Sequence, residues 1–318
     1  MKLELEKTGL AAAFLFAGIS MAAGQDKAPV VAADTVPGRV LEAPVNTRPL
    51  RDKFWWSEDW YERGILEVPQ NYQVEETHLA YTNKADGTEV PAILYRPRGN
   101  KKFPAILFQH GRRGLDELVQ RLARRMAARG FVVLAPDVYA ARFIDTLPLT
   151  HDPATEGDVD AGVDFLLARK DISTSKICLY SHTRGGYYTL KVAVKYKRQN
   201  RNVACYVSFY PHWQDPNAPE PLQVYRYDKD LDKLQIPVMV FIGEYEQYQR
   251  RRSIETAVLY MKRAGRNVKL IIYPGVGRGF DFRPPHVRTF ADDLATRDSN
   301  LRAANFMKKH LESWKKSH

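Results

Sequence analysis

The feature that most constrains the fold is an alternation of short apolar runs with longer amphipathic segments, from about Thr77 onward. Continuous apolar runs are typical of parallel strands buried on both faces, whereas the longer segments carry apolar residues at helical spacing. The strand-like runs are Pro104–Gln109, Phe131–Ala135, Lys176–Tyr180, Val203–Phe209, Pro237–Ile242 and Val268–Tyr273. Strands that alternate with helices predict an α/β fold with a mostly parallel central sheet and helices on both faces.

The segments between these runs predict the helices. Helical spacing, often ended by glycine or proline, marks Leu115–Arg129, Thr155–Arg169, Gly185–Lys197, Ser253–Arg263 and a C-terminal helix with Ala304, Met307, Leu311 and Trp314. Before the first buried run, His78–Thr82 and Val90–Arg96 flank a turn signal, so we expect a hairpin there.

The composition favours one globular domain without a nucleic-acid partner. Hydrophobic residues make up 44% of the 318 residues, enough to bury a sizeable core, and we assign residues 48–318 to a single domain. The net charge of +11 comes from scattered Lys and Arg, and no basic run interleaves with aromatics. Neither metal-ligand spacings nor phosphate-binding glycine loops occur, so we expect no metal and no cofactor.

The amino terminus indicates export. Lys2 and Lys7 precede an apolar run from Gly9 to Met21, followed by small residues. That run is short for a membrane span and is typical of a secretory signal, so residues 1–23 are predicted to be a cleaved signal segment and 24–47 a linker. The expected location is the periplasm or the exterior, with no stable membrane span after cleavage. An uncleaved anchor is the alternative.

Polar motifs follow the buried strands, where ligands bind on such sheets. His110-Gly111-Arg112-Arg113-Gly114 follows one strand, and Ser181-His182-Thr183-Arg184-Gly185-Gly186 follows another. Gly243-Glu244-Tyr245-Glu246 and Tyr273-Pro274-Gly275-Val276-Gly277-Arg278-Gly279-Phe280-Asp281 come after the last two. A strand followed by x-nucleophile-x-Gly-Gly and then a helix is the pattern of the nucleophile elbow of hydrolases.

Together with Ala135–Ala140 (APDVYA), these motifs resemble the dienelactone hydrolase family of the α/β-hydrolase fold, over roughly Glu75 to Leu311. The resemblance implies ester or lactone hydrolysis, with a Ser or Cys nucleophile at Thr183, an Asp at Glu246 and a His at Arg278. All three positions depart from the family pattern. A guanidinium stays protonated and cannot act as a general base, so we predict that hydrolysis by the usual triad is lost.

Two interpretations of the altered site remain open. Arg112, Arg113 and Arg184 would gather with Arg278 around the pocket and bind a carboxylate, phosphate or sulfate. Alternatively, Arg278 pairs with Glu246 and Asp281 and fills the place of the triad.

Further segments carry weaker expectations. Cys178 and Cys205 are expected to be buried free thiols, and Arg250-Arg251-Arg252 a solvated face. Pro211–Asp232 is expected to form a cap over the pocket, and the aromatic cluster of Phe54–Tyr61 a flap on the core.

The leading hypothesis is an exported dienelactone-hydrolase-like protein without triad activity that binds an anionic small molecule. The alternative is an active ester or lactone hydrolase that uses Thr183 with a relocated base such as His286; His182 and His110 are weaker candidates. A third hypothesis is a structural or partner-binding domain with the aromatic cluster Phe54–Tyr61 as its contact surface.

Overall fold

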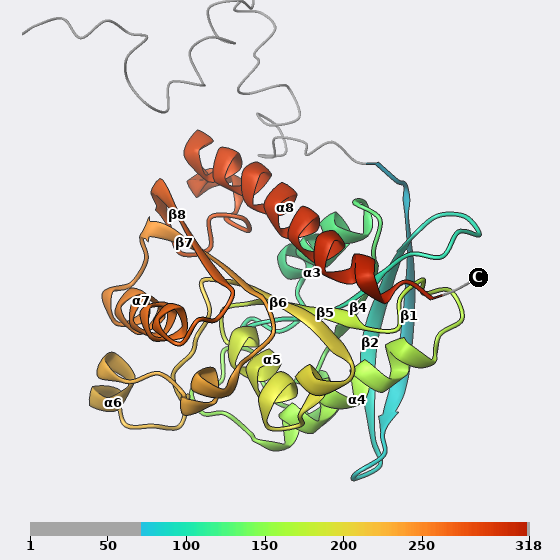
Figure 1. The fold of residues 1–318 in the computed structure, drawn as a ribbon, viewed down its shortest axis with the longest axis horizontal. Coiled ribbons are helices and arrows are strands. Elements are labelled where there is room, and N and C mark those ends of the chain that lie inside the picture. The colour runs from blue at the N-terminus through green and yellow to red at the C-terminus, as the bar shows by residue number, and fades with distance from the viewer. Residues whose placement is uncertain (1–70, 317–318) are drawn as a thin grey trace, which may run out of the picture. The chain divides into compact units, whose positions relative to one another are not determined.

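The computed structural model describes residues 71–316, and these contain one eight-stranded sheet (Figure 1). The expected signal segment, the linker, the aromatic cluster and the domain boundary at residue 48 lie outside the described residues. The strands are β1 (Val74–Asn83), β2 (Thr88–Pro97), β3 (Ala105–Gln109), β4 (Val132–Pro136), β5 (Ile177–His182), β6 (Val203–Phe209), β7 (Val238–Tyr245) and β8 (Val268–Gly277).

The sheet has the strand order β1-β2-β4-β3-β5-β6-β7-β8. The β1–β2 hairpin and the β2–β4 pair are antiparallel, and every pair from β4 to β8 is parallel. The order reverses where β3 lies between β4 and β5. The expected α/β-hydrolase fold is therefore confirmed, and the carboxyl ends of β3, β5, β6, β7 and β8 meet at one edge.

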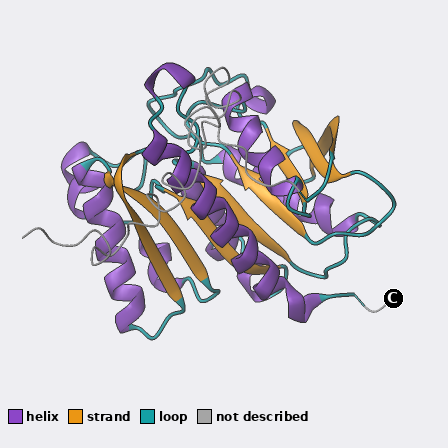
Figure 2. Cartoon of the chain, turned by 90° about the horizontal axis from the view of Figure 1, so that it is seen from above, coloured by secondary structure: helices purple, strands orange, loops and turns teal. Residues whose placement is uncertain are grey.

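Helices cover both faces of the sheet, as Figures 1 and 2 show. One face carries α3 (Glu117–Ala127) and α8 (Phe290–Leu311), which contact each other; the other carries α4 (Ala154–Ala168), α5 (Gly185–Val194) and α7 (Tyr248–Arg263). Helices α3 and α8 both begin with a side-chain cap: Asp116 accepts a hydrogen bond from Val119 N, and Thr289 forms a capping box with Asp292. Within residues 71–316 no helix is long and apolar enough to cross a membrane.

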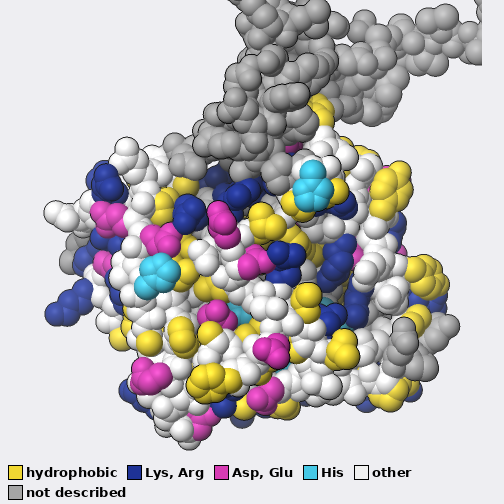
Figure 3. All heavy atoms as spheres, turned by 180° about the vertical axis from the view of Figure 1, so that it is seen from behind, with side chains coloured by type: hydrophobic (Ala, Val, Ile, Leu, Met, Phe, Trp, Pro, Cys, Tyr) yellow, Lys and Arg dark blue, Asp and Glu magenta, His cyan; other side chains and the backbone are white. Residues whose placement is uncertain are grey.

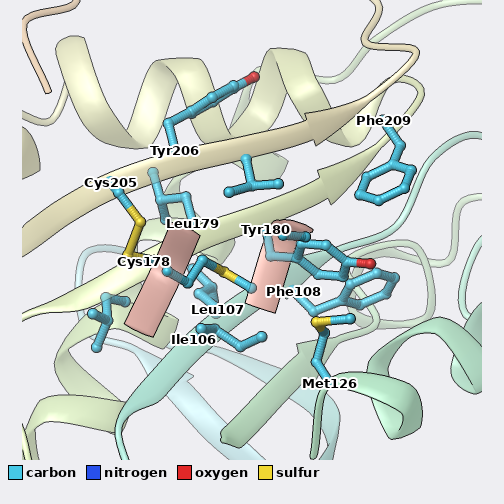
Figure 4. Close-up of a cluster of buried hydrophobic side chains, with 14 of the residues drawn as sticks. Ile106, Leu107, Phe108, Met126, Cys178, Leu179, Tyr180, Cys205, Tyr206 and Phe209 are labelled. Atoms are coloured by element: carbon cyan, nitrogen blue, oxygen red, sulfur yellow. A yellow bond between two sulfur atoms is a disulfide. The ribbon is translucent and has the colours of Figure 1, made fainter. Parts of the chain in front are cut away.

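The core lies between the sheet and its helices, and all five residues of β3 and all seven of β6 are buried. Figure 4 shows apolar side chains of β3, β5 and β6 gathered with Met126 of α3. The continuous apolar runs that predicted these strands thus mark strands buried on both faces. The surface view of Figure 3 shows basic side chains interspersed with acidic and apolar ones, in line with the scattered charge of the sequence.

The expectation of free thiols is wrong, because Cys178 and Cys205 form a disulfide between β5 and β6 (Figure 4). A register shift between Ile177 and Cys178 places the two cysteines directly opposite each other, with their Cα atoms 4.8 Å apart. At paired positions of neighbouring parallel strands both side chains leave the same face, so that separation is within bridging reach.

Removing this disulfide is expected to destabilise the protein substantially. The bridge joins two residues with a sequence separation of 27, and loss of such a constraint costs about 3 kcal/mol of unfolding free energy. The double variant Cys178→Ala, Cys205→Ala should therefore unfold at lower urea concentration than the oxidised wild type, measured by tryptophan fluorescence. Wild-type protein unfolded with a reductant should match the variant; equal midpoints for the variant and the oxidised wild type would contradict the expectation.

The element boundaries differ from the predictions mainly at helix ends. The structure adds α6 (Glu220–Tyr225) within the expected cap segment and a 3₁₀ turn at Lys229–Lys233 at its end, and α7 begins at Tyr248 rather than Ser253. Trp314 lies in a 3₁₀ turn after α8 rather than in the helix.

Candidate active site

Thr183 lies on a sharp turn between β5 and α5 in a left-handed conformation, with φ of 52°. This region is strained for a β-branched residue, and such strain is concentrated at functional turns. The turn is held because Thr183 N donates to Phe209 O (3.1 Å) and Gly186 N donates to Thr183 O (3.0 Å). A Cβ on Gly111 would lie only 1.5 Å from Thr183 Oγ1, so glycine is required where the hydroxyl meets the loop after β3.

A cavity of about 190 Å³ lies over this elbow at the carboxyl ends of the strands. Its lining is partly polar, with arginine, histidine and glutamine residues, and partly apolar, with Val119, Leu122 and Phe282. The remaining lining residues are Gly111, Arg112, Arg113, His182, Thr183, Arg184, His212, Gln247, Arg250 and Arg278. Polar groups that converge on a partly apolar cavity define the default binding site of such a fold.

The structure brings the three triad-equivalent positions together. Arg278, after β8, donates from Nη1 to Oε1 of the buried Glu246, after β7, over 3.0 Å. Its Cζ lies 5.3 Å from the ring centre of Tyr210, so the guanidinium is also stacked on an aromatic face. The position that a proton-accepting imidazole should occupy therefore holds a fixed cation without a lone pair to accept a proton.

Asp281 does not join that pair. It is buried and accepts hydrogen bonds from His182 Nε2 (2.8 Å) and from the Tyr210 hydroxyl. Burial raises the pKa of Asp281, but the contacts with His182 and Tyr210 and the charge of Arg125 outweigh it, and the pKa is lowered overall. His182 is thus bound through Nε2 to a carboxylate and stacked on Phe209 beneath the elbow.

The side chains of Arg112 and Arg184 hold a loop. Arg112 donates to the carbonyls of Leu147 and Pro148, and Arg184 to those of residues 148–150. Arg113 pairs with Asp116. By contrast, the backbone N–H groups of Arg112 and Arg184 donate to no acceptor within residues 71–316. Such a pair after the first buried strand and after the nucleophile position has the arrangement of an oxyanion hole.

Arg250 was expected on a solvated face, and this is wrong. Because α7 begins at Tyr248, its first turn directs Arg250 into the cavity wall, while Arg251 pairs with Glu255 along the helix. Arg250 Nη1 donates to Gln214 Oε1 (2.8 Å), a neutral partner. Burial, together with the charges of Arg278 and Arg184, lowers its pKa to about 10.

His212 is the other cavity residue that the sequence patterns did not reveal. Its backbone N–H donates to Thr183 O (2.8 Å), and its side chain lies in the cavity wall. Burial lowers the pKa of His212 well below the usual range, and the charges of Arg250, Arg278 and Arg184 add to this. The sequence feature that could have indicated His212 is its position just after β6, at the same sheet edge as the elbow. We instead assigned that segment to a cap.

The remaining histidine candidates lie elsewhere. His286 is exposed on the 3₁₀ turn Pro285–Val287 and does not line the cavity. His110 is buried, with Nδ1 2.8 Å from Gly111 O, and does not line the cavity either. Among the described residues no group of three or more potential metal-ligand side chains is present.

The strand order, the elbow and the site at the strand ends define a protein of the α/β-hydrolase fold. The sequence model of the dienelactone hydrolase family matches residues 90–311. The chain belongs to the dienelactone hydrolase family.

Relatives agree with this family, and solved structures agree with the fold. A protein of Methylorubrum extorquens named "Putative carboxymethylenebutenolidase" is 26% identical over 220 residues, covering 64% of this chain and 73% of the relative. A protein of the same name from Yersinia pestis is 24% identical and covers 67% and 82%. An esterase of Pyrobaculum calidifontis has a TM-score of 0.55 at 19% identity, with coverage of 76% and 86%. A fungal esterase of Rhizomucor miehei has a TM-score of 0.59 at 16% identity, with coverage of 85% and 93%.

Proposed function

We propose that this is an exported member of the dienelactone hydrolase family that binds a small organic anion in the cavity and does not hydrolyse esters through the family's triad. The observation that carries the proposal is the Arg278–Glu246 pair at the positions of the base and the acid. A guanidinium bonded to the carboxylate leaves the Thr183 hydroxyl without the usual base.

The charge balance of the cavity supports an anionic ligand. Glu246 offsets Arg278 and Asp116 offsets Arg113, whereas Arg250 and Arg184 bond to neutral amides and carbonyls. Uncompensated guanidinium groups in a partly buried cavity favour a carboxylate or a phosphate. The apolar residues in the lining favour an organic anion with a small hydrocarbon body, and benzoate is a suitable probe.

The disulfide supports the proposed export. Structural disulfides persist in oxidising compartments such as the periplasm and the exterior, and are rare in the cytosol. Fractionation of the producing cells, with amino-terminal sequencing of the exported chain, tests this part of the proposal. Protein that is retained in the cytosol with reduced cysteines would contradict it.

Arg250 is expected to be essential for anion binding. Since its guanidinium has neutral partners, Arg250→Gln removes a charge that is available to the ligand, and the affinity for benzoate should fall at least about tenfold. Isothermal titration calorimetry measures the change, with inorganic phosphate as a second probe. Arg251→Gln is the matched control, because the neighbouring arginine pairs with Glu255. Equal losses in both variants would point to a general charge effect.

Activity assays test the other half of the proposal. The wild-type protein should show no turnover of p-nitrophenyl acetate above a Thr183→Ala variant and no labelling by a fluorophosphonate. Stoichiometric labelling of Thr183 would refute it.

A second candidate function is hydrolysis of a small ester or lactone by Thr183. The unpaired N–H groups of Arg112 and Arg184 favour it, because an oxyanion hole stabilises the developing charge even where the base is weak. A base at His286 would require that exposed turn to approach the cavity. Loss of a measured activity in both Thr183→Ala and His286→Ala would support this candidate over ligand binding.

A further inference from the structure

His212 has an unusual position for a buried histidine. His212 is only 4% exposed, and its ring nitrogen Nε2 has no hydrogen-bond partner within residues 71–316. The backbone of His212 is held by its N–H bond to Thr183 O. The preceding residue, Pro211, packs so closely on Gly186 that a Cβ added to this glycine would lie 2.6 Å from the Cβ of the proline. The imidazole is therefore held in the cavity wall beside the elbow, with one nitrogen unused by the protein.

Charged groups from several elements surround this ring. Arg184 at the start of α5, Arg250 on α7 and Arg278 after β8 each disfavour a proton on His212, whereas a hydrogen-bonding contact of the ring with the side chain of Gln223 on α6 favours one. The other ionisable groups that line the cavity are Arg112, Arg113 and His182, and Glu246 is already bonded to Arg278. Burial and these charges therefore favour the neutral imidazole.

An anion in the cavity reverses this balance. A carboxylate among the arginines offsets their charge at the ring, and an opposite charge within a few ångströms favours the protonated form of histidine. The unpartnered Nε2 could then donate to the anion as an imidazolium, a stronger hydrogen bond than a neutral one.

Building on the anion site proposed above, we propose that His212 Nε2 takes up one proton from solvent when an anion fills the cavity, so that the ligand is held by an imidazolium as well as by guanidinium groups. The overall step is anion plus proton plus neutral histidine, giving an anion–imidazolium pair. The ligands of this cavity are thus acids taken up as the anion together with a proton. Binding strengthens as the pH falls from the pKa of the bound-state histidine toward its lower ligand-free pKa, and it is weakest and independent of pH above the bound-state value.

Isothermal titration calorimetry of the full chain measures the proton uptake that accompanies anion binding. Benzoate is titrated at about pH 7 into buffers of different ionisation enthalpy, and the slope of the observed enthalpy against that quantity gives the protons taken up per benzoate. Benzoate, an ordinary carboxylate, stays ionised there, so any uptake belongs to the protein. We expect uptake approaching one proton, and an affinity that rises by up to about tenfold per pH unit on acidification.

Two variants test whether His212 is the residue that takes up the proton. His212→Gln should bind benzoate more weakly and without proton uptake, whereas His78→Gln, at an exposed histidine on β1, should behave as wild type. Because His212→Gln could perturb the loop, the ring nitrogens of wild-type protein labelled on histidine are also followed by NMR, with and without benzoate. A buried imidazole that changes from neutral to doubly protonated on binding is expected.

The outcomes separate the two proposals. Benzoate binding with no proton uptake in the wild type, or with uptake unchanged in His212→Gln, overturns the role of His212 and leaves the anion site standing. If neither probe binds, the anion site itself fails, and this inference fails with it.

Discussion

The triple variant Thr183→Ser, Glu246→Asp, Arg278→His is expected to hydrolyse p-nitrophenyl acetate at least about a hundredfold faster than the wild-type protein. The turn at residue 183, the glycine that accommodates its side chain and the two unpaired N–H groups are already present. Serine removes the branched methyl from a left-handed turn, and histidine replaces a cation with a group that can accept the proton.

The control is the same double change at 183 and 246 combined with Arg278→Gln. It removes the guanidinium without supplying a base, so it should remain near the wild-type rate. Initial rates with p-nitrophenyl acetate and labelling by a fluorophosphonate provide two independent measurements. If the triple variant folds and is no faster than this control, the proposal that these three residues prevent hydrolysis by a triad is wrong.

Asp281→Asn is expected to lower the unfolding free energy by about 3–5 kcal/mol at neutral pH, because it breaks a buried network with His182 and Tyr210. The lowered pKa of Asp281 gives the pH dependence. A carboxyl with a lowered pKa in the folded state stabilises the protein above its unfolded pKa of about 4, and this contribution is lost as the pH falls through the folded-state value.

The difference in unfolding free energy between wild type and Asp281→Asn should therefore be largest near neutral pH and shrink progressively below about pH 4. Urea unfolding at a series of pH values measures it. Asp145→Asn, at an exposed carboxylate, serves as the control and should change the free energy little. A difference that grows on acidification would contradict the assigned role of Asp281.

The sheet could be predicted from the sequence because its strands are buried on both faces. An uninterrupted apolar run as short as that of β3 favours a buried strand over an amphipathic helix, and the motifs at the strand ends then locate the site. The helix α6 could not be predicted in the same way, because it is six residues long and lies in a segment without apolar periodicity.

Parts of the site depended on geometry that the sequence does not contain. The disulfide required a one-residue register shift between β5 and β6, and periodicity alone does not report a register. Arg250 faces the cavity only because α7 starts a turn earlier than its apolar pattern indicates. His212 required the contact between Pro211 and Gly186, which brings the segment after β6 back onto the elbow.

The cross-link between Cys178 and Cys205 also limits how a ligand can enter. It ties the strand that leads to Thr183 to the strand that leads to His212, so these two walls cannot move apart by separation of β5 and β6. The side of the cavity formed by the ends of β5 and β6 is therefore covalently braced, and a ligand has to fit between Thr183 and His212 at a fixed separation of these two strands.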